Sequence, residues 1–101
     1  MADDTENPID VKDPFARRLI LQYVNRRKAE LDTLRSALAA GRFRDIQITG
    51  HNMSGSGSAY GLDRISEIGA RMEAAAKAGQ DTEVERLISK LDSYVHTIRL
   101  K

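Results

Sequence analysis

Apolar side chains recur every three or four residues in four consecutive segments, and this repeat constrains the fold more than any other feature of the chain. The four stripes are Phe15, Leu19, Ile20, Tyr23, Val24, Leu31, Leu34 and Leu38; Phe43, Ile46, Gly50, Met53, Gly57 and Tyr60; Leu62, Ile65, Ile68, Met72 and Ala75 or Ala76; and Val84, Leu87, Ile88, Leu91, Val95 and Ile98. Such spacing gives an α-helix one face that must be buried. A chain of 101 residues has room for one core. The pattern predicts an all-α fold, an antiparallel up-down-up-down four-helix bundle.

Capping residues and glycines mark the ends of the four helices. Asp13 and Pro14 favour a helix start, as N-cap and first helical residue, and Gly41 favours its end. The second helix is predicted from Arg42 or Phe43 to Gly61, and the third over about 63–77 before Gly79. Asp81 or Thr82 is predicted to cap the fourth. Residues 1–12 are predicted to form a short, flexible and loosely ordered N-terminal segment, so the domain spans 13–101.

The composition argues against several kinds of partner and setting. A net charge of +1 argues against binding to nucleic acid. The chain has no cysteine, which excludes disulfides and thiolate metal sites and agrees with a reducing compartment. Its acidic, polar start is unlike a signal peptide, and no apolar run approaches the roughly 18 residues of a membrane span. We therefore expect a cytoplasmic monomer that contacts neither nucleic acid nor membrane.

His51, one of two histidines, lies in the second predicted helix, away from its apolar stripe. At ~100° per residue it points about 130° from the stripe, toward solvent. No cysteine, tryptophan or second histidine lies near it in the sequence to act as a metal or catalytic partner. Its face also holds Arg44, Ile48, Gly55 and Ser58. An exposed imidazole beside an outward apolar residue and a glycine suits a histidine that carries a group between proteins.

The run Ser54–Ser58, which reads Ser-Gly-Ser-Gly-Ser, has two interpretations. In the first interpretation, the run is a flexible linker between two helical hairpins, because each glycine within a helix costs about 1 kcal/mol relative to alanine. In the second it continues the helix. The second is favoured because Gly50, Met53, Gly57 and Tyr60 keep the apolar stripe in register, and an inward glycine permits close helix packing.

The run His51-Asn52-Met53-Ser54-Gly55-Ser56-Gly57, with Gly61 beyond it, resembles a known motif. That motif has a histidine, any residue, an apolar residue, a basic residue, a glycine and two small residues, followed later by another glycine. It belongs to the histidine-containing phosphotransfer (HPt) domains of multistep phosphorelays. An Ala-rich segment with a glutamate, Met72–Gly79, and the segment Asn25–Gly41 are also similar to free-standing bacterial members. The resemblance covers most of the chain, from residue 14 to residue 99.

The resemblance implies a phosphorelay intermediate. His51 would accept a phosphoryl group from a receiver-domain aspartyl phosphate and pass it to another receiver domain. The partners would be the receiver domains of a response regulator and of a hybrid histidine kinase. They would dock on a surface made of Ile48, Ser54, Gly55, Ser58 and Arg44. Such a protein is not an enzyme with its own turnover, binds no ATP and holds no cofactor, and a divalent cation such as Mg²⁺ is expected on the receiver.

The chain departs from the family motif at Ser54, where a lysine or arginine is usual. A cation at that position would offset phosphoryl charge by on the order of 1 kcal/mol, whereas serine offers only a hydroxyl. The run Arg26-Arg27-Lys28 is a candidate replacement, because antiparallel packing of the first two helices brings it alongside residues 55–58. The same run is alternatively an ordinary solvated patch. Arg44, two turns before His51, is a second candidate.

Two other functions stay open on the sequence alone. A helical-bundle binding module would dock a signalling partner through the His51 face without being phosphorylated, and the loss of the basic residue at Ser54 favours it. The second alternative is the dimerisation domain of a histidine kinase, although such a domain requires a long helical hairpin and a following catalytic domain. His96 has no motif around it, and we predict an ordinary surface residue there.

Overall fold

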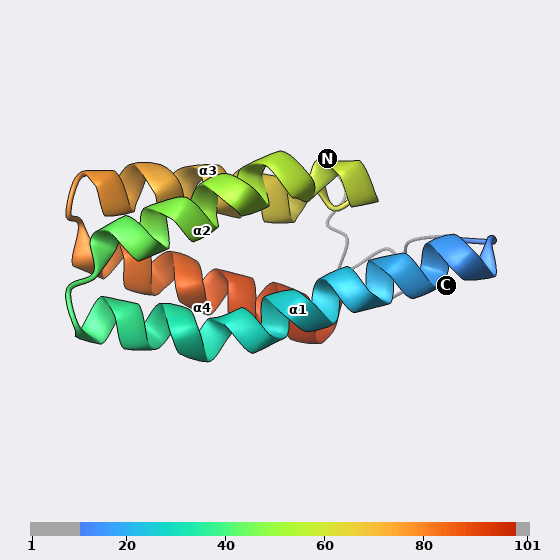
Figure 1. Ribbon diagram of the computed structural model, residues 1–101, viewed down its shortest axis with the longest axis horizontal. Coiled ribbons are helices and arrows are strands. Elements are labelled where there is room, and N and C mark those ends of the chain that lie inside the picture. Colours follow the sequence, from blue (N-terminus) through green and yellow to red (C-terminus); the bar gives the residue numbers. More distant parts are fainter. Residues whose placement is uncertain (1–10, 99–101) are drawn as a thin grey trace.

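Four α-helices and one 3-10 turn form the fold in the computed structural model, which describes residues 11–98. They are α1 (Pro14–Ala39), α2 (Phe43–Ser56), η1 (Ser58–Tyr60), α3 (Asp63–Lys77) and α4 (Asp81–Thr97). Helices adjacent in sequence pack side by side, and α4 packs back against α1, so the chain runs up and down around one core (Figure 1). The predicted all-α four-helix bundle is confirmed. Most of the segment predicted to be flexible, residues 1–10, lies outside the described residues, whereas Val11 packs against the core.

The ends of α1 and α3 follow from the predicted capping residues. The Asp13 carboxylate accepts a hydrogen bond from the Phe15 backbone N–H at 2.9 Å, and Pro14 is the first helical residue. Gly41 and Gly79 have φ angles of +71° and +67°, the left-handed region that glycine adopts without strain. The starts and stops predicted from these four residues are confirmed.

The end of α2 differs from the prediction. The α-helix stops at Ser56 instead of continuing to Gly61, and a 3-10 turn follows. The backbone N–H groups of Tyr60 and Leu62 both donate to the Gly57 carbonyl, at 3.0 and 2.9 Å. This tightening turns the chain toward α3 within a few residues. The linker interpretation of residues 54–58 is also wrong, because the first three residues are helical and Gly57 keeps helical angles, φ −55° and ψ −51°.

The predicted apolar stripes form the core except at the start of α1. The side chains that are almost completely buried are Leu34, Ile46, Met53, Leu62, Ile65, Met72, Leu87, Ile88, Leu91, Val84 and Val95. Phe15 and Leu19 were expected in the core, but they are 66% and 38% exposed. Helix α1 has 26 residues, against 14 to 17 in the other helices. Its first turns therefore extend past the ends of its neighbours (Figure 1). Periodicity alone cannot show how far the other helices within residues 11–98 cover them.

Three glycines allow α2 and α3 to approach until their backbones touch. A Cβ atom on Gly50 would lie 2.8 Å from the Glu73 backbone nitrogen, and one on Gly69 would lie 2.6 Å from the Ser54 backbone nitrogen. A Cβ atom on Gly57 would meet α3 at a similar distance. The close packing predicted for inward glycines is thus confirmed at Gly50 and Gly57. This contact fixes the register of the two helices, and the register decides which side chain of α3 lies beside His51.

Candidate functional site

The His51 imidazole has a partner that lies on a different helix. Its Nδ1 atom lies 3.0 Å from Oε2 of Glu73, on α3. The His51 side chain remains 72% exposed, and that of Glu73 is 32% exposed. The expectation that His51 lacks a partner is therefore wrong, because the glycine contact between α2 and α3 places Glu73 next to it.

The contact with Glu73 assigns different roles to the two ring nitrogens of His51. An ionised carboxylate only accepts hydrogen bonds, so the neutral imidazole donates its Nδ1–H to Glu73. The lone pair is then on Nε2, the nitrogen on the far side of the ring. A ring nitrogen with a free lone pair is a nucleophile, and the contact with Glu73 favours one orientation of the ring that carries it.

His51 borders an open hollow of about 170 Å³ on the α2–α3 face. The hollow is lined by Arg44, Gln47, Ile48, His51 and Glu73. Ile48 is 48% exposed, and Arg44 is also exposed. An apolar side chain and a cation thus line the same shallow depression as the imidazole, and the depression is open to a large partner.

The other residues predicted to contact a partner lie further along α2 and in η1. Gly55 is exposed, and nothing lies within 4 Å of the place that a Cβ atom would occupy. Ser58 is exposed as well, and its backbone N–H and hydroxyl both donate to Oγ of Ser66, at 2.8 and 3.1 Å. Ser54 is half-buried where α2 meets Gly69 of α3. Gly55 thus leaves open surface one turn after His51.

No hydrogen bond or ion pair within residues 11–98 joins the basic run of α1 to His51. The Tyr23 hydroxyl and Ser56 Oγ lie 2.6 Å apart, so this part of α1 does lie alongside the end of α2. Arg27 is only 7% exposed; its Nε lies 2.6 Å from Glu30 Oε1, although not aligned for a hydrogen bond. Its guanidinium also stacks 4.5 Å from the centroid of the Tyr23 ring. Arg27 was predicted in a solvated patch or beside a phosphoryl group, but it is packed and paired.

The neighbours of Arg27 in that run are more accessible. Arg26 is exposed and Lys28 is half-buried. Neither lines the hollow beside His51.

His96 lies on the surface, as predicted, and its surroundings differ from those of His51. It is 54% exposed in the last turn of α4, with Nδ1 2.8 Å from Oδ1 of Asp92. The Arg35 guanidinium donates to the other Asp92 oxygen at 2.7 Å, and this bond holds the pKa of Asp92 below its usual range. His96 therefore lies beside an ion pair, Arg35–Asp92, that joins α1 and α4.

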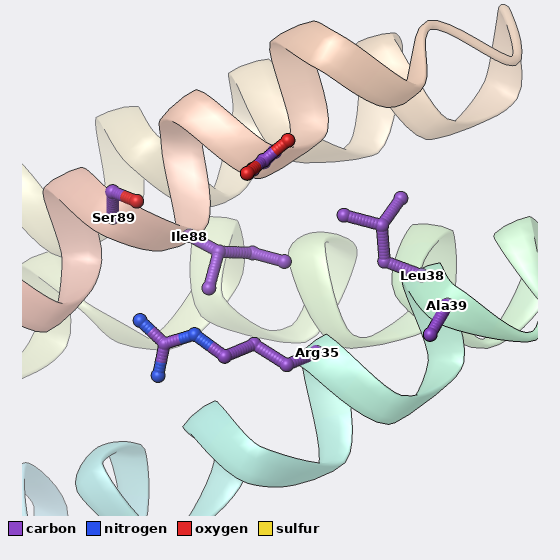
Figure 2. A pocket seen from close by; sticks show the side chains of 6 residues that line it. Arg35, Leu38, Ala39, Ile88 and Ser89 are labelled. Atoms are coloured by element: carbon purple, nitrogen blue, oxygen red, sulfur yellow. The ribbon is translucent and has the colours of Figure 1, made fainter.

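A second and larger hollow, of about 320 Å³, lies between α1 and α4. It is lined by Arg35, Leu38, Ala39, Glu85, Ile88 and Ser89. Figure 2 shows Leu38 and Ile88 on facing helices, with Arg35 along one side. This hollow is the larger of the two, but none of its lining residues is a histidine. The smaller hollow, beside His51, is therefore the candidate site.

Two further properties of residues 11–98 bear on the site. They contain no group of three or more His, Cys, Asp or Glu side chains that would hold a metal ion. None of their helices has both the length and the apolar character of a membrane span.

Comparison with known proteins gives one match. The sequence matches a family model, described as Hpt domain, over residues 18–100. A search of curated proteins and a search of solved structures give no match. Hpt domains are phosphotransfer modules of phosphorelay signalling that interact with receiver domains. The matched region is most of the sequence and includes every residue that lines the hollow beside His51, so the chain belongs to the Hpt domain family.

Proposed function

We propose that His51 is the phosphoacceptor of a phosphorelay intermediate. It takes a phosphoryl group from an aspartyl phosphate of one receiver domain and passes it to another receiver domain. The observation that carries the proposal is the exposed imidazole whose Nδ1 pairs with Glu73 at 3.0 Å. That contact leaves Nε2 as the nucleophile on an open face of the protein.

In the proposed step, the lone pair of Nε2 attacks phosphorus in line with the aspartyl oxygen. The N–P bond forms as the aspartyl O–P bond breaks, and the aspartate carboxylate leaves. The proton on Nδ1 stays in place, so the phosphorylated ring is a cation. Glu73 stabilises this cation because a carboxylate accepts a charge-assisted hydrogen bond from it. The reverse step delivers the phosphoryl group to the next receiver.

The partner is proposed to supply the rest of the chemistry. A divalent cation such as Mg²⁺ on the receiver would neutralise charge on the phosphoryl oxygens. The present chain, as a cytoplasmic monomer, would contribute a positioned nucleophile and a docking surface. It would have no turnover of its own and no ATP site, in keeping with a sequence that lacks a Gly-rich nucleotide loop followed by lysine.

The receiver is proposed to dock over Ile48, Gly55, Ser58 and Arg44, with Ser54 at the edge of this surface. We expect Gly55→Leu to fold normally, because the site of the new side chain is open. The larger side chain should hold the partner away and weaken receiver binding by roughly tenfold, about 1.4 kcal/mol. Binding measured by titration calorimetry, with Gly55→Ala as the size control, tests this. Equal affinities for Gly55→Leu and wild type would remove Gly55 from the docking surface.

Glu73 is proposed to act on His51 as a positioning residue. Glu73→Gln removes the charge that pairs with the phosphorylated ring, and we expect transfer to slow by about tenfold, the loss of one charge-assisted hydrogen bond. Nitrogen-15 shifts of the imidazole should also show a mixture of tautomers, because glutamine both donates and accepts. Glu67→Gln is the matched control on α3, since Glu67 pairs with Arg71. Wild-type tautomer and rate in Glu73→Gln would contradict this role.

The direct test of the function is phosphotransfer from a phosphorylated receiver domain in the presence of Mg²⁺. We expect phosphate to move to this protein in a form that is labile in acid and stable in base, the behaviour of an N–P bond. If the receiver binds but keeps its phosphate under all conditions, the protein is a binding module that docks through the His51 face without being phosphorylated.

A further inference from the structure

A positive charge near the hollow beside His51 would stabilise the phosphorylated state of the protein. A phosphoryl group on Nε2 adds nearly two negative charges. The Glu73 carboxylate, 3.0 Å from Nδ1, adds another. The imidazolium ring offsets one of these charges, so the phosphorylated site carries a net negative charge. A nearby cation would lower the free energy of this state.

Three basic side chains in this half of the bundle are already paired. Arg42 lies 3.2 Å from Asp45, and Arg71 lies 3.3 Å from Glu67. Arg27 is buried against Glu30 and the Tyr23 ring. These ion pairs leave the three guanidinium groups with carboxylate partners in the unphosphorylated protein.

Arg44 is the basic residue that lines the hollow. It is exposed and has no ion pair or side-chain hydrogen bond within residues 11–98. It precedes His51 by two helical turns, about 10 Å along the axis. Seven residues make close to two full turns, so both side chains lie on the same face of α2, and both line the hollow. A phosphoryl group on His51 would therefore lie beside the hollow that Arg44 also lines.

We propose that Arg44 binds the phosphoryl group of phosphorylated His51. The inference rests on the proposed function. A guanidinium group suits this role because its fork of N–H donors pairs with two phosphoryl oxygens and is always charged. Arg44 would thereby supply the charge that Ser54, the half-buried residue one turn after His51, lacks.

The test uses phosphoramidate, a small phosphoryl donor that modifies histidine without a receiver domain. The phosphorus-31 shift of the phosphorylated protein, followed against pH, gives the proton affinity of the phosphoryl group. In Arg44→Gln this affinity should rise roughly threefold to fivefold, because a neighbouring cation favours the dianion. Arg44→Lys should restore most of the wild-type value. Added salt should reduce the difference between wild type and Arg44→Gln.

Arg42→Gln is the matched control, since Arg42, the N-cap residue of α2, precedes Arg44 by two positions but does not line the hollow. It should titrate like wild type. If His51 is phosphorylated and Arg44→Gln also titrates like wild type, the role of Arg44 is wrong and the proposed function stands. If neither phosphoramidate nor a phosphorylated receiver modifies His51 of the wild-type protein, the proposed function fails and the role of Arg44 fails with it.

Discussion

The His51→Gln variant is expected to accept no phosphoryl group from a phosphorylated receiver domain, whereas its fold remains intact. Glutamine has no ring nitrogen that can form an N–P bond, so the loss should be complete. The side chain is 72% exposed, and glutamine is a good helix former, so we expect little change in stability. Radiolabelled phosphate retained by the protein after denaturing electrophoresis at alkaline pH measures the transfer.

His96→Gln is the matched control for this variant, because His96 is also an exposed helical histidine whose Nδ1 contacts a carboxylate. It should accept the phosphoryl group at the wild-type rate. Labelling of His51→Gln at the wild-type level, or loss of labelling in His96→Gln, would contradict the assignment of the acceptor.

The second large effect is expected from Gly50→Ala. A Cβ atom there would lie 2.8 Å from backbone atoms of both Gly69 and Glu73, and backbone cannot move aside as a side chain can. Helices α2 and α3 must separate, which should lower the free energy of unfolding by about 1–3 kcal/mol, the usual cost of overpacking. The separation also moves His51 away from Glu73, so phosphotransfer should slow in the folded protein.

Gly55→Ala, on the same helix, is expected to raise the stability of the protein instead of lowering it. Nothing lies within 4 Å of the added Cβ atom, and alanine is favoured over glycine within a helix by about 1 kcal/mol. Urea denaturation should therefore show Gly55→Ala more stable than wild type and Gly50→Ala less stable. If Gly50→Ala gains stability as Gly55→Ala does, the two helices are not in backbone contact.

The parts of the fold that depend on local pattern could be predicted from the sequence. Periodicity places Ile46, Met53 and Met72 in the core, where all three have no exposed surface. Capping chemistry places the start of α1 at Pro14 and a glycine with positive φ at position 41. Each of these features is decided by residues within a few positions along one helix.

The parts that depend on how two helices meet could not be predicted in this way. Glu73 is 22 residues from His51, and only the register of α2 against α3 brings them together. The signal that was available is the pair of inward glycines, Gly50 and Gly69, with Glu73 one turn after the second. The burial of Arg27 likewise accompanies its contact with Tyr23, whose ring stacks on Tyr60 and whose hydroxyl meets Ser56 of α2.

The measurement that tests the central claim most directly is nitrogen-15 and phosphorus-31 NMR of the phosphorylated protein, labelled at the histidine rings. The geometry at Glu73 predicts phosphorus bonded to Nε2 of His51, visible as a nitrogen–phosphorus coupling at that atom, with a proton retained on Nδ1. Phosphorus on Nδ1 of His51 would contradict the role of Glu73, and phosphorus on His96 or on no histidine would contradict the proposed function.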